Sequence, residues 1–209
     1  MAKKTAPKKA KAAPKKEIKP AKQEVKAKDA EPKVEIQVVN IVVSTSLEHD
    51  VPLEKMAATL SNTEYNPEQF PGLVIRIKEP KTSALIFSSG KVVCTGARSM
   101  QKVEESIQKI IESLQKIGIK ITIKPKINIQ NIVASGSIGM DLNLNVLAMK
   151  LSNTEYEPEQ FPGLVYKLME AKATFLLFSN GKVVCTGTKS EAEVHTALEL
   201  LIKNLKKVM

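Results

Sequence analysis

The chain has no tryptophan, and its 209 residues include only two cysteines and two histidines. Cys94 and Cys185 each lack a second cysteine or a histidine nearby, which argues against zinc and favours small buried thiols. His49 and His195 lie in polar stretches and support no catalytic role. We therefore expect no metal, no cofactor and no enzymatic activity.

Long apolar runs are also missing. No segment reaches the roughly 20 apolar residues needed to cross a bilayer, and the N-terminal region lacks the apolar core of a secretory signal. These absences predict a soluble, intracellular protein.

The charge is distributed unevenly along the chain. Residues 1–33 hold twelve lysines against four acidic residues, so they carry +8 of the formal net charge of +10. Lysine, alanine and proline dominate this segment, which is typical of a disordered basic tail. Such a tail is attracted to phosphate backbones without selecting a sequence; a nuclear address or a solubilising extension is the alternative.

The most informative feature of the sequence is an internal duplication. Residues 61–74 (SNTEYNPEQFPGLV) return 91 positions later with one change, from Asn66 to Glu157, and GKVVCTG at 90–96 returns at 181–187. This period is too long for a solenoid repeat and predicts two domain-sized halves, 34–124 and 125–209, related by an approximate two-fold axis. Duplex DNA is a ligand with matching symmetry.

Both halves show the same order of predicted elements. In the first half, a β-branched run at 34–44 predicts a strand, 51–60 a short helix, and 73–78, 84–88 and 92–97 three further strands. A long amphipathic helix follows at 100–117 and ends at Gly118. In the second half, 144–151 and 191–207 predict the corresponding helices. This order indicates an α+β fold.

Alternation along these strands places apolar or small side chains on both faces of the sheet. The long helices can cover one face, but no helix remains for the other. That face would carry Asn40, Val42, Ser44, Leu85, Phe87, Val93 and Thr95, with the residues 91 positions on. It is smooth and aliphatic, without the usual anchors of a protein-binding patch, and suits an A·T minor groove, where a guanine amino group would clash. Burial of the face in an oligomer is the other expectation.

Two kinds of residue on this face leave alternatives open. Asn40 and Asn131 should lie near the two-fold axis, where their amides could donate to base acceptors or make ordinary strand-end hydrogen bonds. For Phe87 and Phe178, packing in the core is the alternative that their residue type alone favours, because apolar strand residues usually lie in the core.

The motifs resemble the TATA-box-binding protein family of archaea and eukaryotes over about residues 34–209. The most specific are QNIV at 130–133, EYNPEQFPGLV and EYEPEQFPGLV, EPKTSALIFSSGKVVCTGARS at 79–99, and FLLFSNGKVVCTGTKS at 175–190. The resemblance implies a saddle-shaped, curved antiparallel sheet of about ten strands, with helices on its convex face and DNA under its concave face. It also implies a general transcription factor that binds a TATA box in the minor groove and bends it by phenylalanine insertion. That factor would nucleate the preinitiation complex with transcription factor B and RNA polymerase.

Matching positions then imply roles for individual residues. The intercalating phenylalanines fall on Phe70, Phe87, Phe161 and Phe178. The floor of the groove falls on Asn40, Val42, Leu85, Val93, Thr95, Asn131, Val133, Leu176, Val184 and Thr186. Phosphate contacts fall on Arg76, Lys81, Lys91, Lys167, Lys172 and Lys182, for which solvated surface charge is the alternative. Glu157 and Glu159 match the acidic pair that binds transcription factor B.

Glu68 and Gln69 before Phe70 have the archaeal form, which implies an archaeal, cytoplasmic and nucleoid-associated protein; a eukaryotic source would imply the nucleus. Ala171 replaces Pro80 in the second copy, which removes a stiff turn residue. The alternative function is a divergent paralogue or interaction module that uses the saddle for other promoters or protein partners. A homodimer of the DNA-free protein, with the concave face buried, is a further expected partner.

Overall fold

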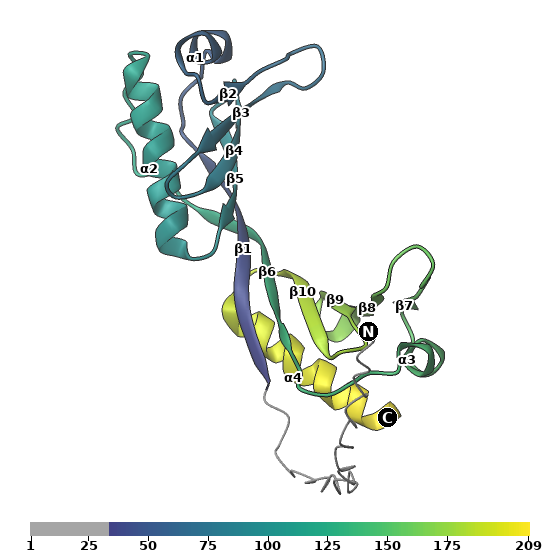
Figure 1. The fold of residues 1–209 in the computed structure, drawn as a ribbon. Helices are drawn as coiled ribbons and strands as arrows, with labels where there is room; N and C mark the ends of the chain where they lie inside the picture. The colour runs from purple at the N-terminus through teal and green to yellow at the C-terminus, as the bar shows by residue number, and fades with distance from the viewer. Residues whose placement is uncertain (1–33) are drawn as a thin grey trace, which may run out of the picture. The chain divides into compact units, whose positions relative to one another are not determined.

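The computed structural model describes residues 34–209, and the predicted basic tail at 1–33 lies outside the described residues. The described chain forms one antiparallel sheet of ten strands in the order β2-β3-β4-β5-β1-β6-β10-β9-β8-β7 (Figure 1). The first five are β1 (Glu35–Ser46), β2 (Thr63–Glu64), β3 (Gly72–Ile77), β4 (Thr82–Phe87) and β5 (Lys91–Ala97). The second five are β6 (Asn128–Ser137), β7 (Thr154–Glu155), β8 (Leu164–Leu168), β9 (Ala173–Leu177) and β10 (Lys182–Thr188). The predicted α+β fold is confirmed.

Within residues 34–209, four α-helices accompany the sheet: α1 (Leu53–Thr59), α2 (Met100–Lys116), α3 (Leu144–Lys150) and α4 (Glu191–Val208). The two long helices start with the same cap, because the hydroxyl oxygens of Ser99 and Ser190 each accept a hydrogen bond from the backbone N–H three residues on. All four predicted helices are confirmed. No helix in the described part of the chain is long and apolar enough to cross a membrane.

The core lies between the long helices and one face of the sheet. Helix α2 contacts β5 and β1, and α4 contacts β10 and β6. Ile41 and Val43 of β1 are buried on the side of the helices, while Val42 between them is only partly buried. Burying each such aliphatic side chain stabilises the fold by about 1.5–3 kcal/mol. The alternation inferred from the sequence therefore places the covered and open faces correctly.

The central strands β1 and β6 join the two repeats. Ile41 pairs directly with Ile132, the residue 91 positions on, so the approximate two-fold axis passes between them. Next to this pair, Asn40 faces Val133, and Val42 faces Asn131. The predicted location of both asparagines near the axis is confirmed. The two repeats thus form a single hydrogen-bonded sheet.

Two features of the structure were absent from the sequence-based expectation. Strands β2 and β7 at the sheet edges each contain two residues, which is too short for a periodic pattern. The turn after β8 is a 3-10 helix, η1 (Met169–Ala171), and it ends at Lys172 with a positive φ of 50°. This element occupies the position that Pro80 has in the first repeat.

Cys94 of β5 and Cys185 of β10 are free and buried, as predicted. Burial raises the pKa of both thiols, and that of Cys185 reaches about 11. Raised thiol pKa values mean that little reactive thiolate exists near neutral pH.

We expect both cysteines to resist thiol reagents in the native protein. For Cys185, a pKa of about 11 leaves roughly 0.1% thiolate at pH 8, against about a quarter for an exposed thiol, so its labelling should be at least about a hundredfold slower. The raised pKa of Cys94 should slow its labelling in the same direction. The rate should rise with pH and become fast in concentrated guanidinium. Ellman's reagent measures this, with Ser88→Cys, at an exposed position, as the fast control. Rapid labelling of the native wild-type chain at pH 8 would contradict the expectation.

Candidate nucleic-acid interface

The face of the sheet that the long helices leave open is built from rows of cross-strand partners. Val74, Leu85, Val93 and Ser44 follow one another across β3, β4, β5 and β1. The same row occurs 91 positions on, in Val165, Leu176, Val184 and Ser135. All eight are partly buried, and directly paired residues lie on the same face of a sheet. We call this surface, together with the asparagines and threonines described below, the open face.

Val74 and Val165 were missed by the sequence analysis. Each pairs with a predicted floor residue, Leu85 or Leu176. The sequence does indicate this position for Val74, because alternation along the predicted strand at 73–78 places Val74 on the other face of the sheet from the buried Leu73.

Two phenylalanine pairs border the open face. The ring centroids of Phe70 and Phe87 are 5.9 Å apart with planes at 62°, and those of Phe161 and Phe178 are 5.9 Å apart at 69°. Phe70 and Phe161 are 43% and 41% exposed. The alternative that Phe87 and Phe178 belong to the core is wrong, because both are only partly buried. Each pair therefore presents aromatic surface that no other part of the described chain covers.

Glycine makes room for each pair. A Cβ atom at Gly72 would lie 2.6 Å from the Phe70 ring and 3.2 Å from the Phe87 ring. At Gly163 the corresponding distances are 2.6 Å and 3.1 Å. Real Cβ atoms essentially never come within 3.0 Å of another heavy atom, so a larger residue would displace the rings of Phe70 and Phe161 from their edge-to-face contacts.

The two asparagines on the open face make identical hydrogen bonds. The Oδ1 atom of Asn40 accepts from the Gly96 backbone N–H at 2.8 Å, and its Nδ2 donates to Thr95 Oγ1 at 3.1 Å. Asn131 does the same with Gly187, at 2.8 Å, and with Thr186, at 3.0 Å. Because the oxygen faces a backbone donor, the orientation of the amide is fixed.

An amide nitrogen carries two hydrogens, and each of these asparagines uses one of them within the sheet. Ordinary hydrogen bonding within the sheet therefore accounts for the oxygen and one N–H of each side-chain amide. The second N–H of each amide remains available to donate to a ligand. Gly96 and Gly187, which supply the orienting N–H groups, were not identified from the sequence. Their positive φ values of 99° and 98° require glycine in the shared GKVVCTG motif.

All six predicted phosphate-contacting side chains belong to exposed residues. Two of them, Arg76 and Lys167, occupy matching positions and are ion-paired. The Nη2 atom of Arg76 lies 3.0 Å from Glu64 Oε2, and Nζ of Lys167 lies 2.6 Å from Glu155 Oε1. Hydrogen bonding and charge from Arg76 lower the pKa of the Glu64 carboxyl group. Within residues 34–209, the other four lysines form no ion pair: Lys81, Lys91, Lys172 and Lys182.

Glu157 and Glu159 lie in the exposed loop between β7 and β8. The carbonyl oxygen of Glu157 accepts from the N–H groups of Gln160 and Phe161, at 3.0 Å and 2.9 Å. Asn66 does the same in the first repeat. The two loops thus share a backbone turn and differ at this position by one negative charge.

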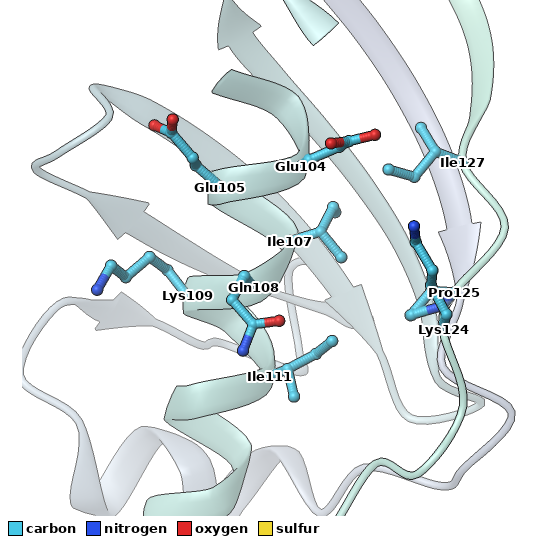
Figure 2. A pocket seen from close by; sticks show the side chains of 9 residues that line it. All are labelled: Glu104, Glu105, Ile107, Gln108, Lys109, Ile111, Lys124, Pro125 and Ile127. Carbon is cyan, nitrogen blue, oxygen red and sulfur yellow. The ribbon is translucent and has the colours of Figure 1, made fainter. Parts of the chain in front are cut away.

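A separate apolar groove lies beside α2, away from the open face. It has a volume of about 380 Å³ and separates the helix from the segment 124–127 (Figure 2). Ile107 and Ile111 point into it from the helix, and Ile127 from the opposite side. Residues 34–209 contain no cluster of three or more His, Cys, Asp or Glu side chains that could hold a metal ion.

Comparisons with known proteins agree with this geometry. A sequence model of the family described as transcription factor TFIID, or TATA-binding protein, matches residues 35–117 and 126–208. The TATA-box-binding protein of Methanocaldococcus jannaschii is 50% identical over 174 residues, which cover 83% of this chain and 95% of that protein. That of Pyrococcus furiosus is 47% identical over 175 residues, which cover 84% and 92%. A solved structure described as Methanococcus jannaschii TBP matches with a TM-score of 0.79 at 50% identity, covering 83% of this chain and 99% of that one.

Proposed function

Because this chain belongs to the TATA-binding protein family, we propose that it binds TATA-box promoter DNA in the minor groove under the open face and bends it. The observation that carries the proposal is a single open aliphatic face with a partly exposed phenylalanine pair in each repeat. Inserting each pair between bases removes stacking worth about a few kcal/mol per step. Burial of the aliphatic floor against the groove offsets this cost.

The open face would also favour A·T pairs. In the minor groove these pairs present only acceptors, which suit the remaining amide hydrogens of Asn40 and Asn131. A guanine amino group would instead approach Val and Leu side chains that offer no acceptor.

We expect a TATA duplex to be bound at least about tenfold more tightly than one with two central G·C substitutions, since each mismatched pair costs about 1–3 kcal/mol. Phe178→Ala should reduce the bend, seen as energy transfer between dyes at the DNA ends, more than it reduces attraction to random DNA. Met149→Ala is the matched control, because Met149 is 79% exposed on α3. An unchanged bend in the Phe178 variant would exclude its role as a wedge.

We also propose that the six exposed cations neutralise phosphates on both sides of the groove. For Arg76 and Lys167 this requires release from, or sharing with, Glu64 and Glu155. The glutamates then act as charges that oppose DNA binding.

Glu64→Gln should strengthen binding to the TATA duplex by up to about fivefold at low salt, the size expected for one exposed charge near a phosphate. Titration of labelled duplex at several salt concentrations measures this. Glu112→Gln removes a similar ion pair on α2, with Lys109, and should leave the affinity unchanged. Equal effects of the two substitutions would indicate a change in net charge rather than release of Arg76.

We propose that the loop carrying Glu157 and Glu159 binds transcription factor B, which then recruits RNA polymerase at the promoter. The exposed side chains and the hydrogen-bonded turn of this loop support the assignment. The assembly would form on DNA in the nucleoid. In the absence of DNA, pairing of two open faces in a homodimer would shield the same aliphatic surface.

Glu157→Lys should reduce formation of the complex of this protein, factor B and DNA by about tenfold or more, because a charge reversal at an interface adds repulsion to the lost attraction. Asn66→Lys at the matching position should leave complex formation intact. Mobility-shift assays with purified factor B distinguish the two. Undiminished recruitment by the Glu157 variant would contradict the assignment.

A further inference from the structure

The turn between β9 and β10 carries Asn180, the one asparagine in the sequence that is followed by glycine. Asn180 is exposed, and it lies two residues after Phe178 and two before Lys182. In the first repeat the matching residue is Ser89, so this dipeptide is not duplicated. A side-chain amide followed by glycine is the arrangement in which a backbone nitrogen most readily attacks the amide carbon, because glycine has no side chain to hinder the approach.

The packing of the turn requires glycine at the position after Asn180. Gly181 has a φ of 74°, in the region that favours glycine, and a Cβ atom there would lie 2.2 Å from the Met140 carbonyl oxygen. The same holds for Gly90 in the first repeat, with a φ of 76° and a distance of 2.2 Å to the His49 carbonyl oxygen. The fold therefore needs the glycine in both turns, whereas it accepts either asparagine or serine before it.

A hydrogen bond holds the Asn180 side chain against the backbone that would attack it. Its Oδ1 atom accepts from the Lys182 N–H at 3.1 Å, which closes a turn around residue 181. This bond keeps the amide carbon beside the Gly181 nitrogen. It also places an N–H donor on the oxygen that gains negative charge when the nitrogen adds to the carbon. The geometry thus favours attack within the turn.

A second hydrogen bond controls when this attack can occur. The Gly181 N–H donates to the Phe178 carbonyl oxygen at 2.9 Å, so the nitrogen reacts only when the turn opens and the proton is lost. The reaction in the folded chain should therefore be slower than in the unfolded chain, and its rate should increase with pH.

We propose that Asn180 is a site of spontaneous deamidation, and that its conversion weakens DNA binding by the second repeat. The Gly181 nitrogen forms a bond with Cγ of Asn180, and the bond from Cγ to the amide nitrogen breaks. The proton of the Gly181 N–H ends on the leaving nitrogen, which departs as ammonia, and a cyclic imide remains. Water then opens one of the two carbonyl–nitrogen bonds of the ring, which gives aspartate or isoaspartate. The sequence of steps needs no oxidant or reductant.

Either product places a carboxylate between Phe178 and Lys182. That charge opposes the phosphate contact predicted for Lys182. Isoaspartate also adds a methylene group to the backbone of the turn, next to the Gly181 carbonyl that accepts from the Ile138 N–H at 3.0 Å. The effect on DNA binding rests on the proposed function, because it requires DNA under the open face.

The test incubates the full chain at mildly alkaline pH and follows residue 180 by peptide mapping, with fragmentation that separates aspartate from isoaspartate. The matched control is Asn180→Ser, which carries the residue of the first repeat in a turn with the same backbone hydrogen bond. Asn180 should lose its amide before any other asparagine of the chain does. The rate should rise with pH and in concentrated denaturant.

The converted chain, separated from unconverted chain by ion exchange, should bind the TATA duplex about fivefold more weakly at low salt, the size expected for one exposed charge near a phosphate. Asn180→Asp should show a similar loss without incubation. Asn180→Ser should keep its affinity through the same incubation, because serine cannot form the imide.

Persistence of the Asn180 amide in the folded chain, under conditions in which the denatured chain converts, would overturn the proposal, because the turn would then protect it. Conversion with unchanged affinity, while the fresh chain still prefers the TATA duplex, would overturn the effect on DNA and leave the proposed function standing. Equal binding of TATA and G·C-substituted duplexes by the fresh chain would instead show that the proposed function is wrong, and the mass measurement would still decide whether Asn180 converts.

Discussion

The pairing of β1 with β6 is the interaction on which the rest of the structure depends. It aligns Ile41 with Ile132 at the approximate two-fold axis and merges the two repeats into one sheet. Because both isoleucines are buried on the same face, α2 and α4 must cover that face together. The opposite face is then left open over its whole width, with an asparagine of each repeat next to the axis. A two-domain arrangement with separate sheets would not produce such a surface.

Much of this could be predicted from the sequence because the relevant patterns are periodic. Alternation along β1 places Ile41 on one face of the sheet and Asn40 and Val42 on the other. The spacing of apolar residues predicts helices α2 and α4. The two-residue strands β2 and β7 carry no period, so they were not predicted. The pairing of Arg76 with Glu64 depends on the register of β2 against β3, which the sequence does not encode locally. For Phe87, alternation gave the right face, whereas the general rule that apolar strand residues lie in the core gave the wrong environment.

The two repeats differ most where they do not face the proposed ligand. In the core, Ala84 corresponds to Phe175, and Ser106, whose hydroxyl lies 2.9 Å from that of Thr82, corresponds to Ala197. Each half fills its interior with different volumes and different hydrogen bonds. The open face carries the same residues twice. Packing can be satisfied in many ways, whereas a two-fold ligand places the same demand on both halves.

The continuous sheet also fixes the distance between the two phenylalanine pairs. Five strand spacings separate β4, which ends at Phe87, from β9, which ends just before Phe178. At about 4.8 Å per spacing, the two strands lie about 24 Å apart across the sheet. Because they run in opposite directions, Phe87 and Phe178 are also displaced from each other along the strands. Hydrogen-bonded strands cannot be stretched or compressed by much, so this length is built into the backbone. Under the proposed function, the protein would select a site by the distance between two deformable base steps as well as by the bases between them.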